Sequence, residues 1–516
     1  MLTVDNLSIE TKKGRKLIDG LTFSLNDGDK LAIIGEEGNG KSTLLKAIYD
    51  DSLISNYCTV KGCISKDSLN IGYLEQKLNA NWDNFTVTEY FLKDSPSADY
   101  DYDRYNEFYR FERALKNLDF DTCVLANGTL IKNLSGGEKV KIQLAKILTL
   151  DSDLILLDEP TNDLDIYMLE KLESFILNTN TPIIYISHDE TLLENTANKI
   201  LHIEQLIRKT KPQFTLKKCN YVEYVSSRQR QIEHQTQIAY SERREKEKKE
   251  EILRNIKQKV ENALIAAKKD PASGRIIAKK MANIKAQEKK LDEEELTEIP
   301  DVEEAIKVIV NSSNSLPNQK KVIELNLPQL KIGNKLLSRN IKLSIFGPQR
   351  VAIVGKNGCG KTTLIRNLIP ELENTPGLKI GYFSQNYAEM LDYKKSPLEE
   401  IQETNNKYNA GTLIGCLKFT REEMLQPIAT LSEGQKAKLL LLKLTIGENN
   451  VLVLDEPTRN LSPLSGPVIR KMLKSYKGAI ITVSHDRKFI NEICDKVYEL
   501  TEEGLYPSNM TELDKG

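Results

Sequence analysis

The sequence predicts an α/β protein of two similar halves joined by a helical hairpin. Three observations support this fold class. A glycine-rich loop follows an apolar strand in each half, a fixed series of short motifs follows each loop, and a long polar segment rich in Lys, Arg, Glu and Gln separates the halves. We place the first half at residues 1–210, the linker at 211–300 and the second half at 301–516.

Each glycine-rich loop has the spacing of a phosphate-binding loop. The apolar strands 30–34 and 350–354 precede them, and a helical pattern follows. Glycines let backbone amides close around phosphates, the lysine reaches the β- and γ-phosphates, and the hydroxyl after it can bind Mg²⁺. The alternative, a plain glycine-rich turn, is disfavoured because the pattern occurs twice. The candidate nucleotide-binding residues are Gly35, Gly38, Gly40, Lys41, Ser42 and Thr43, and Gly355, Gly358, Gly360, Lys361, Thr362 and Thr363.

Four further landmarks follow each loop in the same order. The first two are a strand ending in Gln76 or Gln385 and a Leu-Ser-x-Gly motif at 134–137 or 431–434, with the first half given first. The other two are an apolar strand ending in Asp158-Glu159 or Asp455-Glu456 and a strand ending in Ser-His-Asp at 187–189 or 484–486. Motif serine and first acid are 23 residues apart in both halves (135 to 158 and 432 to 455). The matched spacing indicates one ancestral unit used twice.

These landmarks fit the chemistry of nucleotide hydrolysis. Asp158 and Asp455 end buried strands and can hold Mg²⁺ together with Ser42, Thr362, Gln76 and Gln385. Glu159 and Glu456 can polarise a water for in-line attack, and His188 and His485 can donate to the γ-phosphate. Taken singly, an Asp-Glu pair after a strand is usually a surface turn and a lone histidine is usually structural. Their repeated order favours catalysis.

The composition indicates the cellular compartment in which we expect the protein. Its 516 residues suffice for about three domains, and 40% hydrophobic with 28% charged residues is typical of a soluble protein. No apolar run is long enough to cross a bilayer, and no basic-then-apolar leader opens the chain. Seven cysteines without a C-x-x-C pair favour free thiols over disulfides or a zinc site. We therefore expect a cytoplasmic protein without a membrane segment.

The linker is basic, although the whole chain has a net charge of −1. Residues 226–290 contain 18 Lys/Arg and 9 Asp/Glu. A break at Asp270-Pro-Ala-Ser-Gly274 predicts a hairpin with its first helix from about Ser226 to Lys268 and its tip near 263–277. Either Asp270 caps the second helix with Pro271 in its first turn, or all five residues form a loop. A solvated spacer is the simple alternative, but basic residues on both arms and apolar residues beside the turn favour binding of a phosphate backbone.

In this order the motifs resemble those of the ATP-binding cassette (ABC) family: Walker A, Q-loop, signature, Walker B and H-switch. The resemblance implies two P-loop cassettes that close head-to-tail and hydrolyse ATP with Mg²⁺. Ser135, Gly136 and Gly137 would then face the ATP held by Lys361, and Ser432 and Gly434 the ATP held by Lys41. Some positions depart from the family pattern, namely Glu138 and Glu433 in the signatures, the second D-loop 459–463, and the lack of an aromatic near Lys12 or Ile332. The choice between ATP and GTP and the equivalence of the two sites therefore stay open.

Twin cassettes with a charged hairpin linker resemble the ABC-F ribosome-associated ATPases, and the stretch 458–465 resembles their antibiotic-resistance branch in low-GC Gram-positive bacteria. The resemblance implies a monomer that binds the bacterial 70S ribosome at the E site and places its linker beside 23S rRNA and P-site tRNA. It would protect the peptidyl-transferase centre from lincosamides, pleuromutilins and streptogramin A compounds. Alternatives are a housekeeping translation factor, the motor of an exporter, and a DNA-repair or chromosome ATPase. The basic linker argues against an exporter, and the lack of zinc cysteines or a very long coiled coil argues against a DNA partner.

Overall fold

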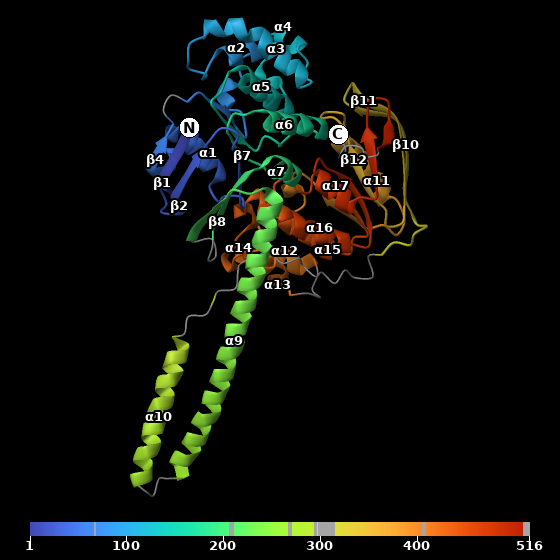
Figure 1. Ribbon diagram of the computed structural model, residues 1–516. Helices are drawn as coiled ribbons and strands as arrows, with labels where there is room; N and C mark the ends of the chain where they lie inside the picture. Colours follow the sequence, from blue (N-terminus) through green and yellow to red (C-terminus); the bar gives the residue numbers. More distant parts are fainter. Residues whose placement is uncertain are drawn as a thin grey trace. The chain divides into compact units, whose positions relative to one another are not determined.

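A computed structural model describes residues 1–66, 69–205, 211–266, 271–293, 297, 315–404 and 409–508 (Figure 1). The chain forms two units, one of residues 1–221 and 303–516 and one of residues 222–302. The first unit holds two α/β cassettes and the second is a helical hairpin, so the predicted fold class is confirmed. The domain boundaries that we expected at residues 210 and 300 lie outside the described residues.

The first cassette combines a mixed six-stranded sheet with a smaller antiparallel sheet. The six-stranded sheet has the order β5-β6-β7-β3-β8-β9 and is parallel except for β9, and the smaller sheet has the order β2-β1-β4. The strands are β1 (Leu2–Thr11), β2 (Lys16–Leu25), β3 (Lys30–Ile34), β4 (Cys58–Ser65), β5 (Ile71–Leu74), β6 (Leu154–Asp158), β7 (Ile183–Ile186), β8 (Lys199–Gln205) and β9 (Lys211–Lys217). The helices are α1 (Lys41–Tyr49), α2 (Val87–Leu92), α3 (Phe108–Asn117), α4 (Cys123–Ala126), α5 (Gly136–Thr149), α6 (Ile166–Asn178) and α7 (Glu190–Thr196).

The second cassette repeats this plan. Its six-stranded sheet has the order β13-β14-β15-β12-β16-β17, and a β10-β11 hairpin takes the place of the antiparallel sheet. The strands are β10 (Lys321–Ile332), β11 (Lys335–Phe346), β12 (Arg350–Val354), β13 (Ile380–Phe383), β14 (Val451–Asp455), β15 (Ala479–Val483), β16 (Lys496–Leu500) and β17 (Leu505–Ser508). The helices are α11 (Lys361–Glu373), α12 (Pro397–Thr404), α13 (Ala410–Gly415), α14 (Arg421–Leu425), α15 (Glu433–Ile446), α16 (Gly466–Ser475) and α17 (Arg487–Ile493).

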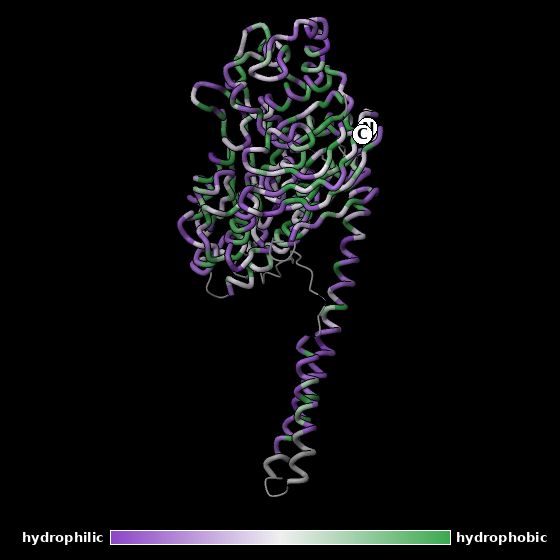
Figure 2. The backbone as a smooth tube through the Cα atoms, turned by 90° about the vertical axis from the view of Figure 1, so that its left-hand side faces the viewer, coloured by the Kyte–Doolittle hydropathy of each residue, from purple (hydrophilic) through white to green (hydrophobic). Residues whose placement is uncertain are grey.

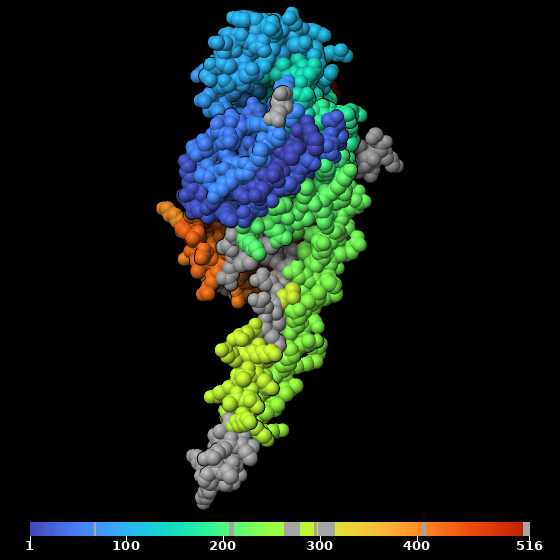
Figure 3. Space-filling view, turned by 60° about the vertical axis from the view of Figure 1, so that its left-hand side comes forward, coloured from blue at the N-terminus to red at the C-terminus, as the bar shows by residue number. Residues whose placement is uncertain are grey.

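The central strands of both cassettes are buried on two faces. Successive side chains of a strand point to opposite sides of a sheet. Accordingly, Val451 and Val453 of β14 pack with β10, β11 and α11, whereas Leu452 and Leu454 pack with α12, α15 and α16. This double burial explains why the central strands read as continuous apolar runs rather than as alternating patterns. In Figure 3 the small antiparallel sheet of the first cassette, in dark blue, forms one surface of that cassette.

The two cassettes contact each other through a small apolar cluster and a set of ion pairs. Ile166 of the first cassette packs with Ala352, Val354 and Ile490 of the second. Acidic side chains of α6 and α7 meet basic side chains of α16 and α17. These pairs are Glu173–Arg487, Glu190–Arg470, Glu190–Lys488 and Glu194–Lys488. The acidic and basic faces fix which surfaces of the two cassettes meet.

The linker unit is a hairpin of α9 (Tyr221–Ala266) and α10 (Pro271–Asp292). The two helices lie side by side (Figures 1 and 3), and Lys257 of α9 pairs with Glu288 of α10 at 2.9 Å. The first arm begins at Tyr221, five residues before the expected Ser226, and spans about 69 Å at 1.5 Å per residue. The hairpin is drawn mostly in purple and white in Figure 2, whereas green hydrophobic segments run through the cassettes.

The second linker helix decides between our two readings of the break. Helix α10 starts at Pro271, so the reading in which all of 270–274 form a loop is wrong. Asp270, the proposed cap, lies outside the described residues, as do the side chains of the expected tip at 263–277. No helix of the described residues is long and apolar enough to cross a membrane.

Candidate nucleotide sites between the cassettes

Both phosphate-binding loops have the backbone that their glycines permit. Gly35, Gly38 and Gly40 have φ angles of 148°, 78° and 93°, a region that side chains disfavour. A Cβ on Gly35 would also lie 2.3 Å from the carbonyl oxygen of Ile203. The Lys41 ammonium donates to the carbonyls of Gly35 and Glu36 at 2.8 and 2.9 Å, and Lys361 does the same in the second loop. Each lysine thus sits at the centre of its own loop.

The strand-end aspartates have the character of magnesium ligands. The Ser42 hydroxyl donates to Asp158 Oδ1 at 2.9 Å, and Gln385 donates to Asp455 Oδ1 at 3.4 Å. Burial raises the pKa of Asp158 to about 6 and also raises the pKa of Asp455. Within the described part of the chain, the Oδ2 atoms of both aspartates are buried and have no hydrogen-bond partner. Such an oxygen suits a hard cation, so these residues fit Mg²⁺.

Glu159 in the first cassette lies in a dense set of donors. Gln76 and Asn162 donate to Oε2 at 2.7 and 2.6 Å, and Nε2 of His188 lies 3.1 Å from Oε1. Burial alone would raise the pKa of Glu159, but the hydrogen bond and charge of His188 lower it to about 2. Nδ1 of His188 lies 2.6 Å from the carbonyl oxygen of Leu461 in the other cassette.

Glu456 in the second cassette has fewer donors. The backbone N–H of His485 donates to its Oε2 at 3.2 Å, and Nε2 of His485 lies 3.4 Å from Oε1. Burial raises the pKa of Glu456 to about 8, and burial together with nearby cations lowers that of His485 to about 3. Gln385 donates to Asp455 rather than to Glu456, unlike Gln76 in the first cassette. The pKa values of the two equivalent glutamates are therefore shifted in opposite directions.

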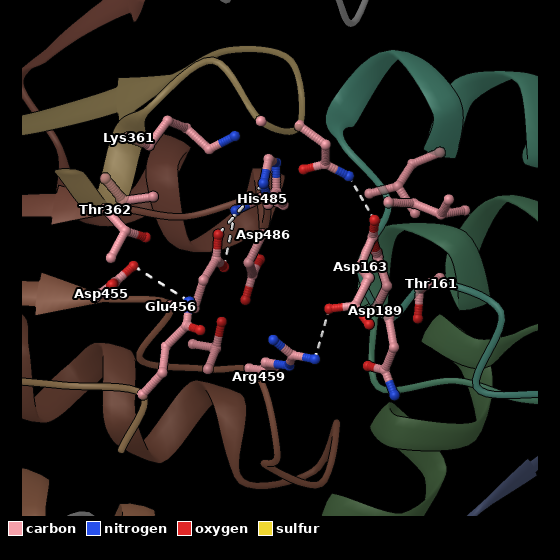
Figure 4. A pocket seen from close by; sticks show the side chains of 18 of the residues that line it. Thr161, Asp163, Asp189, Lys361, Thr362, Asp455, Glu456, Arg459, His485 and Asp486 are labelled. Atoms are coloured by element: carbon pink, nitrogen blue, oxygen red, sulfur yellow. Dashed lines mark hydrogen bonds and ion pairs between the residues drawn. The ribbon is translucent and has the colours of Figure 1, made fainter. Parts of the chain in front are cut away.

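The second nucleotide site is built from both cassettes. A cavity of about 370 Å³ is lined by Lys361, Thr362 and Glu456 on one side and by the first cassette's Asp163 on the other (Figure 4). Arg459 pairs with the Asp163 carboxylate at 2.7 Å across this cavity. The side-chain amide of Asn357 donates to the Asp163 carbonyl. Loop 162–165 of the first cassette thus contacts the phosphate-binding loop of the second.

The signature motifs lie opposite the other cassette's loop, as the head-to-tail arrangement requires. Ser135, Gly136 and Gly137 line a cavity of about 850 Å³ together with Asn357 and Gly358. Gly434 donates its backbone N–H to the Glu37 carboxylate of the first loop at 2.8 Å. The first site has its own cavity of about 220 Å³, lined by Lys41, Ser42, Gln76, Glu159 and His188 and by Asn460 of the second cassette.

One departure from the family pattern has a structural explanation. Ser135 caps α5 by accepting from the Glu138 amide, and the Glu138 carboxylate accepts from the Ser135 amide in return. Ser432 and Gln435 form the same capping box at α15. Either Glu or Gln can serve at this third helical position. Glu138 therefore leaves the signature helix capped as Gln435 does.

Two residues beside or within the first phosphate-binding loop were missed by sequence reasoning. We expected no aromatic near Lys12, but the Lys12 amide donates to the Tyr57 carbonyl at 3.0 Å, and Tyr57 is adjacent to Thr43 of the phosphate-binding loop. A hydrogen bond with Thr43 partly offsets the burial that raises the Tyr57 pKa. Glu37 was the second omission. Its signal was present in the sequence, since the equivalent position of the second loop is Asn357.

This geometry defines a twin-cassette P-loop protein whose two nucleotide sites each take residues from both cassettes. The family model described as ABC transporter matches residues 18–162 and 338–459. The chain is 28% identical to the ribosome protection protein VmlR of Bacillus subtilis over 98% of this chain and 87% of that protein. It is 27% identical to ABC transporter F family member 5 of Arabidopsis thaliana, with 95% of this chain and 73% of that protein covered.

Solved structures show the same fold. An archaeal ribosome recycling factor, aABCE1, superposes with a TM-score of 0.59 at 14% identity, covering 95% of this chain and 87% of that one. RNase-L inhibitor gives a TM-score of 0.57, also at 14% identity, over 95% and 88% of the two chains. The chain belongs to the ABC family and, within it, to the ABC-F ATPases. It is therefore an enzyme that binds and hydrolyses ATP.

Proposed function

We propose that both composite sites bind ATP with Mg²⁺ and that each hydrolyses it with residues of the motifs described above. At the first site Lys41 binds the terminal phosphates, Ser42, Gln76 and Asp158 hold the cation, and Glu159 takes the proton of the attacking water. His188 orients that glutamate and reaches the γ-phosphate. At the second site the same roles fall to Lys361, Thr362, Gln385, Asp455, Glu456 and His485.

The signature helices complete each site from the other cassette. The N-terminus of α5 (Ser135, Gly136, Gly137) points its amides at the ATP held by Lys361, and α15 (Ser432, Gly434) does the same for Lys41. Helix N-termini favour anions because their first amides lack intrahelical partners. Binding of ATP therefore draws the cassettes together, and hydrolysis releases them.

The function of this ATPase cycle is to protect the ribosome in the bacterial cytoplasm. The observation that carries the proposal is the α9–α10 hairpin, a separate unit inserted between two ATPase cassettes. Helix α10 contains six Lys/Arg and two Asp/Glu, which suits a phosphate backbone. The relative VmlR is itself named a ribosome protection protein. On a 70S ribosome the hairpin enters from the E site and lies beside P-site tRNA and 23S rRNA.

The protected site is the peptidyl-transferase centre, and the drugs are of the lincosamide, pleuromutilin and streptogramin A type. The hairpin tip, near 263–277, changes the drug site, and the basic arms hold RNA whatever its sequence. A housekeeping translation factor would share the platform but would not change drug sensitivity. An exporter motor would bind membranes instead of ribosomes.

The test starts from a trapped enzyme. The double variant E159Q/E456Q should hydrolyse ATP at least ~100-fold more slowly, the scale expected for loss of a general base, and should cosediment with ribosomes only with ATP. Adding K279Q/K280Q/K285Q on α10 should weaken cosedimentation and flatten its salt dependence. A matched control, K321Q/K331Q/K342Q on β10 and β11, removes as much charge from the second cassette and should leave sedimentation unchanged.

A variant of the hairpin tip tests drug protection separately from ATP hydrolysis and ribosome binding. Shortening residues 268–275 to a minimal turn should preserve ATP hydrolysis and ribosome binding but abolish drug protection in cells. Full protection by the shortened protein would refute the assignment of protection to the tip. Unchanged drug sensitivity in a deletion strain would favour the housekeeping alternative, and cosedimentation with membranes would favour the exporter motor.

A further inference from the structure

The two phosphate-binding loops differ in charge where they face the other cassette. The first loop has Glu36 and Glu37 at the positions where the second has Lys356 and Asn357. The remaining key residues, three glycines, a lysine and a hydroxyl, are equivalent in both loops. The charge of this face therefore differs by three units, from two carboxylates to one ammonium.

Glu37 makes a specific contact with the opposite signature helix. Its Oε2 accepts the backbone N–H of Gly434, the second residue of the 14-residue helix α15, at 2.8 Å. Glu36 beside it pairs with Lys418 of the same cassette as α15, at 3.2 Å. An anion therefore already sits at the amides that, in the composite arrangement, would meet the terminal phosphate of a nucleotide held by Lys41.

The second site provides an internal comparison. A Cβ on Gly434 would lie 3.2 Å from Glu37 Oε2, and a Cβ on Gly137 would lie 3.2 Å from Asn357 Nδ2. The two loop residues thus approach equivalent glycines of the two signature helices. Asn357, however, brings no charge, and its amide donates to the carbonyl of Asp163. The backbone N–H of Asn357 donates to Asp165 at 3.1 Å, which keeps this residue on the neighbouring loop.

We propose that Glu37 makes the first site discriminate against nucleoside triphosphates relative to diphosphates. A terminal phosphate must displace the Glu37 carboxylate from the Gly434 amide and then lie close to it, with like charges repelling. A diphosphate ends one phosphate earlier, so Glu37 can keep its contact. The second site lacks this carboxylate and has Lys356 on the same face, so it favours the triphosphate.

This inference rests on the assignment of the Lys41 loop as a nucleotide site, but not on any role at the ribosome. It is tested with purified full-length protein in which only one site binds. In a K361A background the dissociation constants of ADP and of a non-hydrolysable ATP analogue report the first site. In a K41A background they report the second.

Removing the Glu37 charge should act on one ligand only. In K361A, the change E37Q should tighten binding of the ATP analogue about tenfold, as expected for removal of one nearby like charge, and change ADP binding less than about twofold. The reciprocal change N357E in K41A should weaken the ATP analogue by a similar factor. As a control, E36Q removes a loop charge that pairs with Lys418 and should shift both ligands equally.

Equal shifts of both ligands with E37Q, or no shift, would overturn the proposal. Failure of N357E to create discrimination would do the same. If neither K361A nor K361A/E37Q bound any nucleotide, the first-site assignment itself would be wrong, and this inference with it. None of these results depends on ribosome binding or drug protection, so the two proposals fail separately.

Discussion

Replacing Arg470 by methionine should destabilise the paired cassettes by about 3 kcal/mol. Arg470 holds Glu190 of the other cassette through two hydrogen bonds, at 2.6 and 3.1 Å, and their side chains are only 4% and 7% exposed. Burial already raises the pKa of Glu190 despite this partner. Breaking a buried pair typically costs ~3–5 kcal/mol, because one charge is left uncompensated. We place the cost at the low end because Lys488 lies 3.5 Å from Glu190 and remains.

A double-mutant cycle isolates this interaction. E190M alone should cost a similar amount, but R470M/E190M should cost at least ~2 kcal/mol less than the sum, because no buried charge is left unpaired. Urea unfolding of the full chain can be followed by circular dichroism and by Trp82, which is the only tryptophan and is buried in the first cassette. K321M, in the exposed pair with Glu324, should leave the stability nearly unchanged. Additive costs for the two methionines would show that the pair does not couple the cassettes.

Two further predictions concern the nucleotide sites. The raised pKa of Glu456, about 8 against 4.5 for an ordinary glutamate, means that the folded chain keeps a proton that the unfolded chain loses. This contribution to stability is complete below pH 4.5 and is lost as the pH rises to about 8, at up to ~1.4 kcal/mol per pH unit. E456Q should therefore flatten the pH dependence of the free energy of unfolding of the nucleotide-free protein between pH 5 and 8. E159Q should not, because the lowered pKa of Glu159 removes stability only as the pH falls toward 2. Equal slopes of the unfolding free energy against pH in wild type and E456Q would contradict this. Separately, Tyr57 lies beside Thr43 of the first phosphate-binding loop, and we expect its ring to stack on a bound base. Y57A in the K361A background should then weaken ATP binding about tenfold while Y57F stays near the parent value. Equal binding by Y57A and Y57F would remove Tyr57 from the site.

The sequence was sufficient for the elements whose residue types are set by local chemistry. A phosphate-binding loop needs its glycines, and a strand buried on both faces needs an apolar run. The strands expected at 30–34 and 350–354 are found there as β3 and β12. The linker was readable as a hairpin because its composition changes sharply and Pro271 opens the second helix. The start of α9 was misplaced by five residues because helix ends depend on contacts as much as on composition.

The remaining features depend on contacts between distant segments. Tyr57 lies near Thr43 of the first loop because the chain before β4 lies against the end of β1. The pairing of Glu173 and Glu190 with Arg487 and Arg470 joins helices of different cassettes, and no short motif encodes it. The different environments of Glu159 and Glu456 also could not be read from motifs that are identical. They arise because burial dominates at Glu456, whereas at Glu159 the hydrogen bond and charge of His188, together with the Gln76 amide, outweigh it.

The differences in loop charge and in glutamate pKa have opposite effects on ATP binding and hydrolysis at the two sites. The first site has an ionised glutamate ready to act as a base, but a loop carboxylate that disfavours the third phosphate. The second has a loop lysine that favours the triphosphate, but a glutamate whose pKa is raised by burial. A divalent cation held by Asp455 would lower the pKa of the adjacent glutamate, because a bound cation favours nearby negative charge. Activation of the base would thus be coupled to metal binding at the second site, whereas at the first site displacement of Glu37 would limit the cycle. Two sites with the same motifs would then be limited by different steps.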